Sequence, residues 1–266
     1  MTTDALELAH VALAVAKEAG AVLQSGYRTR PSVERKAPVD LVTEWDRRSE
    51  ALIVERLSKL TPKLPILAEE GGGCVGSELG WYCDPLDGTT NFVHGHPFFA
   101  VSIGAMQNGQ AMAGAVVAPA LGWFWSGARG HVAIRNGEAC HVSDTSQLGD
   151  ALLATGFPPN RERAPHNNFD AYMRAKRRVR GVRRCGSASI DLCFVADGTY
   201  DGYWERALHA WDVAAGAAIV LAAGGALTSL DGGAPRYEIG HVLASNQILH
   251  GDLLALVGES PLQVPE

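Results

Sequence analysis

Two aspartates, Asp84 and Asp87, stand three positions apart in the segment "DPLDGTTNF" at residues 84–92, directly after a short apolar run. Pro85 restricts the backbone between them and has no N–H group that needs a partner. Both carboxylates, together with the Leu86 carbonyl, can then face one small volume. Hard cations such as Mg²⁺ prefer oxygen ligands of this kind. The spacing therefore predicts a divalent cation site.

The residues that follow are suited to an anion. Gly88 lets the backbone approach a ligand closely, and residues 89–91 are predicted to begin a helix whose free N–H groups face that ligand. Carboxylates beside this helix start would repel a phosphate unless cations lay between them. The simpler alternative is a turn in which Asp87 or Thr89 only caps the helix. An isolated D-x-x-D-G-T pattern leaves both interpretations open.

Further acidic residues favour the metal site. Glu69 and Glu70 follow a predicted strand, and Asp212 stands at the start of a long apolar helix. An acidic residue is favourable at a helix N-terminus on dipole grounds alone, so Asp212 proves little by itself. Together with Asp84 and Asp87, these side chains supply enough carboxylates for two or three cations.

Apolar spacing predicts the elements that position these residues. Helices are expected over 4–27 and 43–60, and short strands over 64–68 and 81–83. Thr43 is the expected N-cap of the second helix, with Asp46 three residues on. The second strand is expected to stop at Asp84. The basic segment 28–39, which contains two prolines, is expected to be an exposed loop.

The rest of the chain mixes strands with helices. Residues 100–142 alternate apolar segments with Asn-Gly turns, which predicts an antiparallel meander. Residues 211–223 predict a buried helix closed by two glycines. Segments 151–155 and 188–196 fit either a strand or a helix. The fold class is therefore α/β or α+β.

Composition limits the classes of function. The 266 residues suffice for one domain or two fused halves, and the net charge of −6 argues weakly against nucleic acid or an anionic membrane as the main partner. Five cysteines without a C-x-x-C pair indicate neither a disulfide framework nor a thiolate zinc site, which fits a reducing cytoplasm. Charged residues interrupt the first segment, unlike a signal peptide. The longest apolar run, 213–227, is too short for an ordinary membrane span.

The motif at 84–92, the acidic pair 69–70 and the segment "WDVAAGAAIVLAAGG" at 211–225 resemble the signatures of the inositol monophosphatase family, whose members are Mg²⁺-dependent, lithium-sensitive phosphatases. The resemblance covers nearly the whole chain, including 36–46 (a mobile loop and the following helix) and 186–188 (a substrate loop). It implies a layered αβαβα sandwich of the inositol monophosphatase and fructose-1,6-bisphosphatase type, as a single domain over 1–266. Its two halves would be about 1–145, for metal and phosphate, and 146–266, for substrate.

The resemblance also implies the metal ligands. Glu69, Asp84 and the Leu86 carbonyl would hold one Mg²⁺, and Asp84, Asp87 and Asp212 a second. A third, weaker ion would lie near Glu69. Li⁺ would inhibit the enzyme.

Other roles are carried over in the same way. Thr89, paired with Glu69, would orient the water that attacks phosphorus in line, so that Glu69, Thr89 and Asp87 form the catalytic group. The backbone amides of Gly88 and Thr89 would bind the phosphate. Positions expected to contact the substrate are Asp87, Gly186, Ser187, Ala188 and Glu205. Positions expected in an outer shell are Lys36, Asp40 and Asp46.

The substrate implied is a small phosphate monoester and the assembly a homodimer. The "TTNF" ending of the motif is more similar to inositol-phosphate enzymes than to relatives in which lysine replaces Thr90, so inositol 1-phosphate is favoured. Fructose 1,6-bisphosphate and histidinol phosphate remain alternatives. The short, glycine-rich interval between Glu69 and Asp84 and the basic stretch 161–184 depart from the family pattern and leave substrate choice open.

Two other functions compete with this interpretation. A haloacid-dehalogenase-type phosphatase spaces its carboxylates two apart near the N-terminus, unlike Asp84 and Asp87. A regulatory protein of the same fold would instead bind RNA or the transcription machinery through the basic segment 174–184. The intact acidic set favours catalysis, and it does not exclude both roles.

Overall fold

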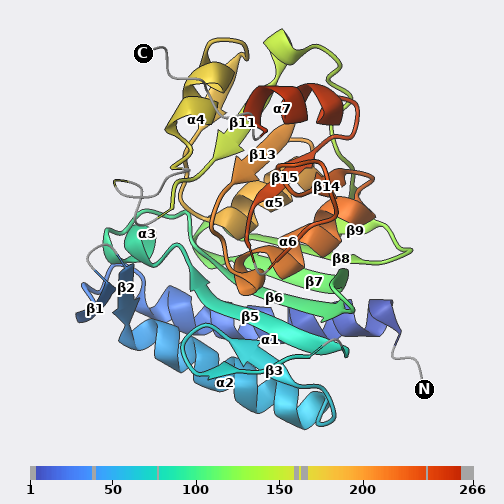
Figure 1. Ribbon diagram of the computed structural model, residues 1–266. Helices are drawn as coiled ribbons and strands as arrows, with labels where there is room; N and C mark the ends of the chain where they lie inside the picture. Colours follow the sequence, from blue (N-terminus) through green and yellow to red (C-terminus); the bar gives the residue numbers. More distant parts are fainter. Residues whose placement is uncertain are drawn as a thin grey trace.

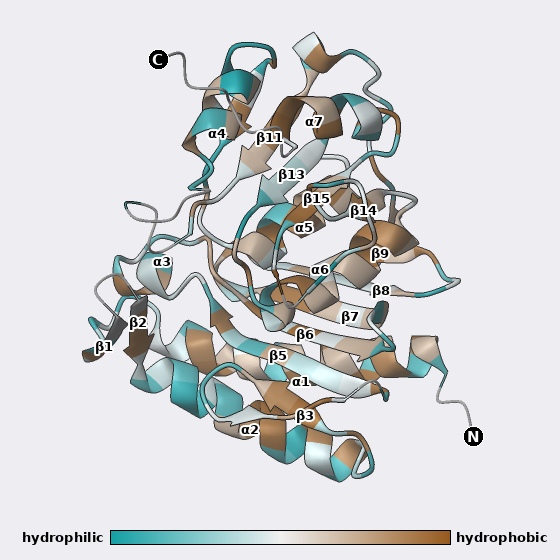
Figure 2. Cartoon of the chain, viewed as in Figure 1, coloured by the Kyte–Doolittle hydropathy of each residue, from teal (hydrophilic) through white to brown (hydrophobic). Residues whose placement is uncertain are grey.

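The computed structural model describes residues 4–37, 40–76, 78–158, 162, 167–237 and 239–258. They form five layers: two helices, an eight-stranded sheet, two helices, a five-stranded sheet and two helices (Figure 1). The αβαβα sandwich expected from the family resemblance is confirmed. Three apolar clusters lie between successive layers and hold the stack together. Figure 2 shows hydrophobic stretches on α6, which lies at the centre of the stack, and on α7, which lies in its last layer.

The first layer contains α1 (Ala5–Gly26) and α2 (Glu44–Leu60), as predicted. Both helices have one apolar face, which packs against the large sheet. Thr43 caps α2: its Oγ1 accepts a hydrogen bond from Trp45 N (3.1 Å), and Asp46 Oδ2 accepts one from Thr43 N (2.8 Å). This cap fixes the position of Asp46 at the start of the helix.

The large sheet has the strand order β10-β9-β8-β7-β6-β5-β3-β4, and only β3 and β5 run parallel. Asn108 and Asn136, each followed by glycine, take positive φ values of 51° and 50° in hairpin turns, which confirms the meander. The strands are β3 (Ile66–Ala68), β4 (Gly72–Gly73), β5 (Gly80–Asp87), β6 (Ala100–Gln107), β7 (Gln110–Ala118), β8 (Trp123–Ala128), β9 (Ala133–Arg135) and β10 (Glu138–Cys140).

The central layer contains α5 (Ala188–Ala196) and α6 (Ala210–Ala222). Helix α6 lies very close to the large sheet, because a Cβ atom at Gly104 or Gly114 would come within 2.5 Å of the Ala215 backbone. At its end, Gly225 N donates to Val220 O and Gly224 N to Leu221 O, the hydrogen bonds of a Schellman motif. The predicted glycine end of this helix is therefore confirmed.

The second sheet has the order β12-β11-β13-β15-β14, and α4 (Phe169–Lys176) and α7 (His250–Val257) lie on its outer side (Figure 1). Segment 151–155, which fitted either a strand or a helix, contains a strand, and segment 188–196 is a helix. Each sheet comes from one half of the chain. The strands are β11 (Leu152–Thr155), β12 (Gly181–Arg183), β13 (Gly202–Glu205), β14 (Ala226–Thr228) and β15 (Val242–Ser245).

The predicted loop over residues 28–39 is wrong in part. Residues Val33–Ala37 form β1, which pairs with β2 (Asp40–Thr43) in a two-stranded antiparallel ribbon. The partner strand precedes α2 and lies outside the basic segment, so local composition did not reveal the pairing. Residues 38 and 39 lie outside the described part of the chain. No helix in the described ranges is long and apolar enough to cross a membrane.

Candidate active site

A β-bulge places Asp84 and Asp87 on the same face of β5. In a regular strand, residues three positions apart point to opposite faces. Asp84 pairs with Ser102 and Asp87 with Ala100, so three steps along β5 match two steps along β6. The extra residue restores the alternation and brings Asp87 to the face of Asp84. The prediction that the strand stops at Asp84 is wrong, because the ladder resumes at Asp87.

This face of β5 is the one that α6 covers. Ser102, opposite Asp84, donates from Oγ to the carbonyl of Trp211 (3.4 Å) at the start of α6, where Asp212 is the third residue. On the other face, the buried Ser49 of α2 donates from Oγ to the Pro85 carbonyl within the bulge (2.8 Å). The bulge therefore points its carboxylates toward the first turn of α6.

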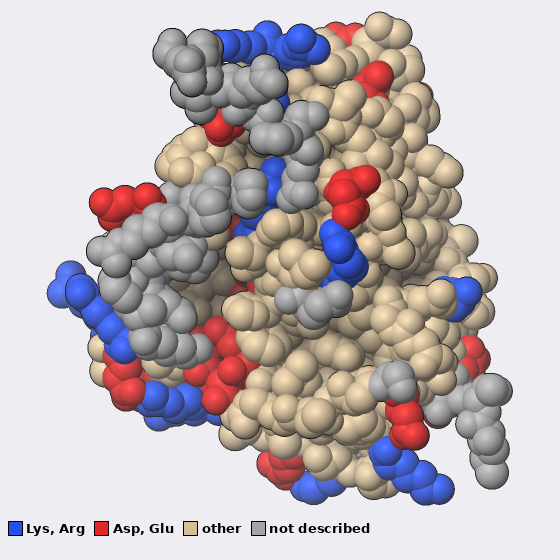
Figure 3. Space-filling view, in the orientation of Figure 1, with Lys and Arg blue, Asp and Glu red and all other residues tan. Residues whose placement is uncertain are grey.

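Electrostatics show that the acidic side chains face one region. Burial raises the pKa of Asp84 well above its usual value, and the carboxylates of Glu69, Asp87 and Asp212 raise it further. Burial also raises the pKa of Asp212, followed by repulsion from Asp87. Acidic side chains gather beside the hollow near β5 and α3 in the space-filling view (Figure 3). Such repulsion favours the binding of cations at this place.

The donor set fits hard divalent cations, since every candidate ligand is an oxygen. In the described part of the chain, no three His, Cys, Asp or Glu side chains already form a cage for one ion. Instead, the carboxylates accept local hydrogen bonds: Asp84 Oδ1 from Leu86 N (2.9 Å) and Asp212 Oδ2 from His209 N (2.7 Å).

Thr89 is the first residue of the short helix α3 (Thr89–Val93). Its hydroxyl lies 3.0 Å from Asp46 Oδ1 and 3.1 Å from the Leu86 carbonyl. Asp46 thus links the cap of α2 to the hydroxyl expected to orient the attacking water. The pairing of Thr89 with Glu69 stays a prediction.

The turn before α3 requires glycine. Gly88 has φ +91°, and a Cβ atom there would lie 2.8 Å from the Phe98 carbonyl and 3.2 Å from the Gly186 carbonyl. Asn91 Nδ2 donates to the Phe98 carbonyl (2.6 Å) and the Cys185 carbonyl (2.9 Å). These contacts join the phosphate-side turn to the loop at Gly186, about a hundred residues later in the chain. The motif at 84–92 predicted no such role for Asn91.

Asp87 is held by the first turn of α5. Its Oδ2 accepts hydrogen bonds from Ser187 Oγ (2.7 Å), Ser189 N (2.8 Å) and Ser189 Oγ (2.5 Å). Ser187 also caps the helix through Ile190 N. The structure thus brings Asp87, Ser187 and Ala188 together, as expected, and adds Ser189. The signal in the sequence was a second serine, close to Asp191, in a mostly apolar segment.

Glu205, at the end of β13, lies in a buried polar network that sequence reasoning missed. It accepts a hydrogen bond from Tyr203, and its carboxylate packs directly on Gly156, where a Cβ atom would be 2.0 Å from both oxygens. Asn168 Nδ2 donates to the Gly156 carbonyl (2.7 Å) and to Thr155 Oγ1 (2.8 Å). Burial raises the pKa of Glu205 to about 7.

Two more charged residues lie near this loop. A Cβ atom at Gly186 would be 2.5 Å from Arg184 Nη1, so the guanidinium covers that glycine. Asp191 is buried in α5, and its Oδ1 has no hydrogen-bond partner among the described residues. Burial, followed by Glu205 and Asp87, raises the pKa of Asp191 well above its usual value. The loop therefore faces an acidic wall with one guanidinium.

Three of the expected site residues lie on or directly after the strands β1, β2 and β3. Lys36 lies in β1 and Asp40 in β2, and their side chains lie outside the described part of the chain. Glu69 follows β3 and is partly buried, with its N–H donating to the Cys83 carbonyl (3.2 Å).

Comparison with known proteins agrees with this fold. The sequence profile of the inositol monophosphatase family matches residues 4–262. An inositol-1-monophosphatase from Mesorhizobium japonicum is 41% identical over 85% of both chains, and the Nus factor SuhB of Pseudomonas aeruginosa is 40% identical over 89% of this chain and 90% of its own. The structure of an Anabaena inositol monophosphatase superimposes with a TM-score of 0.87 at 38% identity, covering 98% of this chain and 97% of the other.

The layered fold and the acidic site define a phosphatase, a hydrolase of phosphoric monoesters. The chain belongs to the inositol monophosphatase family, whose members are generally metal-dependent.

Proposed function

We propose that this protein hydrolyses a small polyol phosphate monoester, with inositol 1-phosphate as the preferred substrate and Mg²⁺ as the cofactor. The observation that carries the proposal is the bulge in β5, which points Asp84 and Asp87 toward Asp212 at the start of α6. Three carboxylates that come together from two distant segments repel one another, which lowers the stability of the fold. No structural role explains their grouping, which supports a role in binding cations.

The metal ligands proposed are those expected from the sequence: Glu69, Asp84, the Leu86 carbonyl, Asp87 and Asp212. Two or three Mg²⁺ ions, when bound, would lower the pKa of a water molecule and neutralise charge on the phosphoryl oxygens. Asp87 would keep its Oδ2 on the two serines of α5, which leaves Oδ1 directed to the site.

The protein's own groups orient the reactants. Asp46 Oδ1 accepts from Thr89, so this hydroxyl has a fixed direction from which it can position the attacking water. The Gly88 and Thr89 amides would bind phosphoryl oxygens at the turn, where glycine allows close approach. The reaction is then an in-line displacement in which positioning and charge stabilisation supply most of the rate.

The substrate side of the site favours hydroxyl groups. Asp191, which is buried, and Glu205, which is partly buried, form an acidic wall that can accept hydrogen bonds from a polyol. A second phosphate group, as in fructose 1,6-bisphosphate, would meet two acidic groups there, with the Arg184 guanidinium beside them over Gly186. We therefore rank inositol 1-phosphate above the bisphosphate, and above histidinol phosphate because Thr90 stands where lysine is common in the relatives that act on it.

Phosphate release from these substrates tests the proposal. Purified protein would be assayed with inositol 1-phosphate, fructose 1,6-bisphosphate and histidinol phosphate, each with Mg²⁺, with chelator, and with added Li⁺. We expect Mg²⁺-dependent, Li⁺-inhibited release, fastest from inositol 1-phosphate. Release that persists with chelator would contradict the metal assignment. A faster reaction with another substrate would correct the specificity.

A second function involves the basic segment 174–184. Several of its arginines are exposed, and Figure 3 shows basic side chains gathered over the α4 end of the molecule. A relative 40% identical to this chain is named a Nus factor. RNA binding would be measured by mobility shift, with Arg177→Gln combined with Arg178→Gln as the variant and Arg56→Gln on α2 as the control. If the unchanged protein, the double variant and the control bound RNA equally, the basic segment would have no role in RNA binding.

The assembly and the compartment are also proposals. We expect a homodimer, which sedimentation equilibrium would detect as twice the chain mass of 28.2 kDa. The five cysteines are unpaired in the structure, as a cytoplasmic location requires.

A further inference from the structure

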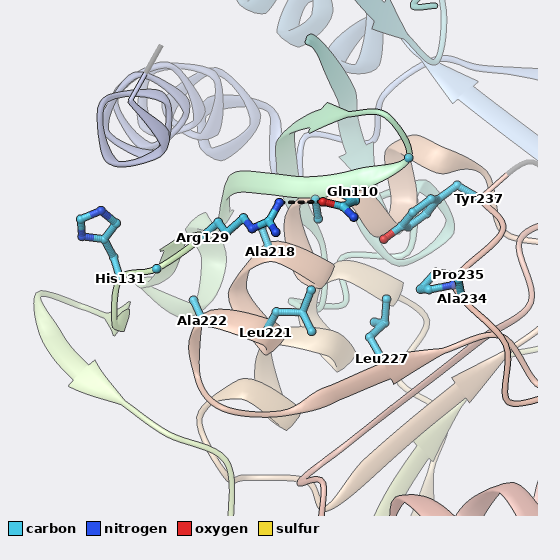
Figure 4. A pocket seen from close by; sticks show the side chains of 13 residues that line it. Gln110, Arg129, His131, Ala218, Leu221, Ala222, Leu227, Ala234, Pro235 and Tyr237 are labelled. Carbon is cyan, nitrogen blue, oxygen red and sulfur yellow. Dashed lines mark hydrogen bonds between the residues drawn. The ribbon is translucent and has the colours of Figure 1, made fainter. Parts of the chain in front are cut away.

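A cavity of about 470 Å³ lies at the C-terminal end of α6, the end opposite Asp212 (Figure 4). The second half of α6, the turn at the start of β7, the residues after β8, Leu227 of β14 and the loop at 234–237 surround it. Its volume lies within the range of small-molecule sites. No residue assigned above to phosphate hydrolysis lines it. We call it the distal cavity.

One side of the distal cavity is apolar. Leu221 and Ala218 of α6, with Leu227 and Pro235, form this side. Leu221 is 47% exposed, and Leu60 is the only other leucine of the described residues that is exposed to this degree. A ligand with an apolar body would remove this surface from water, which contributes about 25 cal/mol per Å².

A buried phenol supplies one polar group. Tyr237 is only 8% exposed, and Figure 4 shows its hydroxyl directed toward the cavity. This hydroxyl is not among the buried polar atoms of the described residues that lack a partner, and it opens onto the cavity, where it can donate to a ligand. Burial raises the pKa of Tyr237, so that the hydroxyl stays protonated and available as a donor.

The rim carries positive charge. Arg129 is exposed and donates from Nη1 to Gln110 Oε1 (2.6 Å), which holds the guanidinium at the edge of the cavity (Figure 4). His131 lies beyond it on the same strand end. Among the described lining residues there is no Asp or Glu. The charge of the rim therefore favours an anion.

We propose that the distal cavity binds a small amphipathic organic anion. Its apolar body contacts Leu221 and Pro235, its charged group lies beside Arg129, and one of its oxygens accepts the hydrogen bond of Tyr237. The site is separate from the proposed active site and does not depend on the reaction performed there.

The probe for this site is 8-anilinonaphthalene-1-sulfonate, an aromatic anion of suitable size whose fluorescence rises in apolar surroundings. Titration of the full chain is expected to give saturable binding of one molecule per chain. Arg129→Gln should weaken binding at least about fivefold, and Tyr237→Phe about threefold, because each removes one polar contact worth about 1 kcal/mol. Leu221→Asp should abolish saturable binding.

Matched controls separate this site from general surface binding. Leu60→Asp changes a leucine of similar exposure, 49%, at the end of α2, and Arg56→Gln removes an exposed arginine on the same helix. Both controls should bind the probe as the unchanged protein does. Arg129→Gln and Leu221→Asp change exposed residues, so native melting temperatures are expected. The proposal would be overturned if the unchanged protein showed no saturable binding of the probe. It would also be overturned if Arg129→Gln and Leu221→Asp bound the probe as tightly as the unchanged protein does.

Discussion

At the scale of single residues, the spacing of Asp84 and Asp87 is explained by one inserted residue. Aspartates three apart on a regular strand would be separated by the sheet, and the bulge brings them to one face. The two serines of α5 then hold Asp87 by one oxygen. Their bonds partly offset the cost of burying this carboxylate.

Asp87→Asn is expected to abolish turnover and preserve the fold. The amide has the same shape and its oxygen can still accept from the serines of α5, whereas the charge needed for a cation is lost. Several kcal/mol of charge stabilisation correspond to a loss in kcat on the order of 10³-fold. Steady-state kinetics and circular dichroism would measure both effects. Asp252→Asn, the same change at an exposed site on α7, should keep full activity. Normal turnover in Asp87→Asn would refute the metal assignment.

At the scale of elements, helices on both faces of the large sheet support the site. Ser49 of α2 bonds the bulge from one face, and α6 covers its carboxylates on the other. The glycines of β6 and β7 let α6 lie close to the sheet, which brings Asp212 near the strand. Each element therefore contributes both packing and site geometry.

Ser49→Ala is expected to destabilise the protein and reduce activity. The Pro85 carbonyl would lose its donor in a buried position, which costs about 1–3 kcal/mol. Urea unfolding would measure the change in free energy of unfolding. Ser25→Ala, on an exposed part of α1, should change it by less than about 0.5 kcal/mol. Equal effects of the two changes would show that the bond to the bulge is unimportant.

Gly156→Ala is expected to change substrate preference. The added Cβ atom would lie 2.0 Å from both oxygens of Glu205, so this carboxylate must move. The KM for inositol 1-phosphate should rise about tenfold, the equivalent of one hydrogen bond to a charged group. Hydrolysis of p-nitrophenyl phosphate, which has no polyol, should be unaffected. Gly149→Ala, where the added atom meets nothing within 4 Å, is the control. A parallel loss on both substrates would indicate general damage instead.

At the scale of the whole molecule, the outer helix α7 packs on the second sheet through apolar side chains, and one histidine adds polar contacts between them. His250 lies within hydrogen-bond distance of Ser245 Oγ on β15 (2.7 Å) and of Thr228 Oγ1 on β14 (2.9 Å). Burial lowers its pKa, so the folded state favours the neutral ring. Below the unfolded pKa of histidine, about 6.5, the unfolded chain binds a proton at this ring more readily than the folded chain does. The free energy of unfolding is therefore unaffected above that pH and falls as the pH drops below it.

The stability advantage of the natural chain over His250→Gln should therefore shrink between pH 7 and pH 5. Urea unfolding at several pH values in the presence of chelator would measure it. His10→Gln, at an exposed site on α1, is the matched control. A constant difference for His250→Gln would mean that His250 titrates alike in the folded and unfolded states.

The sequence by itself determined the local features of this protein. The Thr43 cap, the Asn-Gly hairpins, the glycine end of α6 and the acidic motif at 84–92 are contacts between neighbours in the chain, and their residue types predicted them. The family resemblance added the layered architecture, because two long motifs stand in the right order.

Only the tertiary structure decided which distant groups meet. The bulge depends on the register of β5 against β6, and the pairing of β1 depends on a strand beyond its own segment. The bonds of Ser189 to Asp87 and the contact of Gly156 with Glu205 span 102 and 49 positions. No local pattern encodes such contacts, because sheet register and helix packing arise from the simultaneous burial of the three apolar clusters.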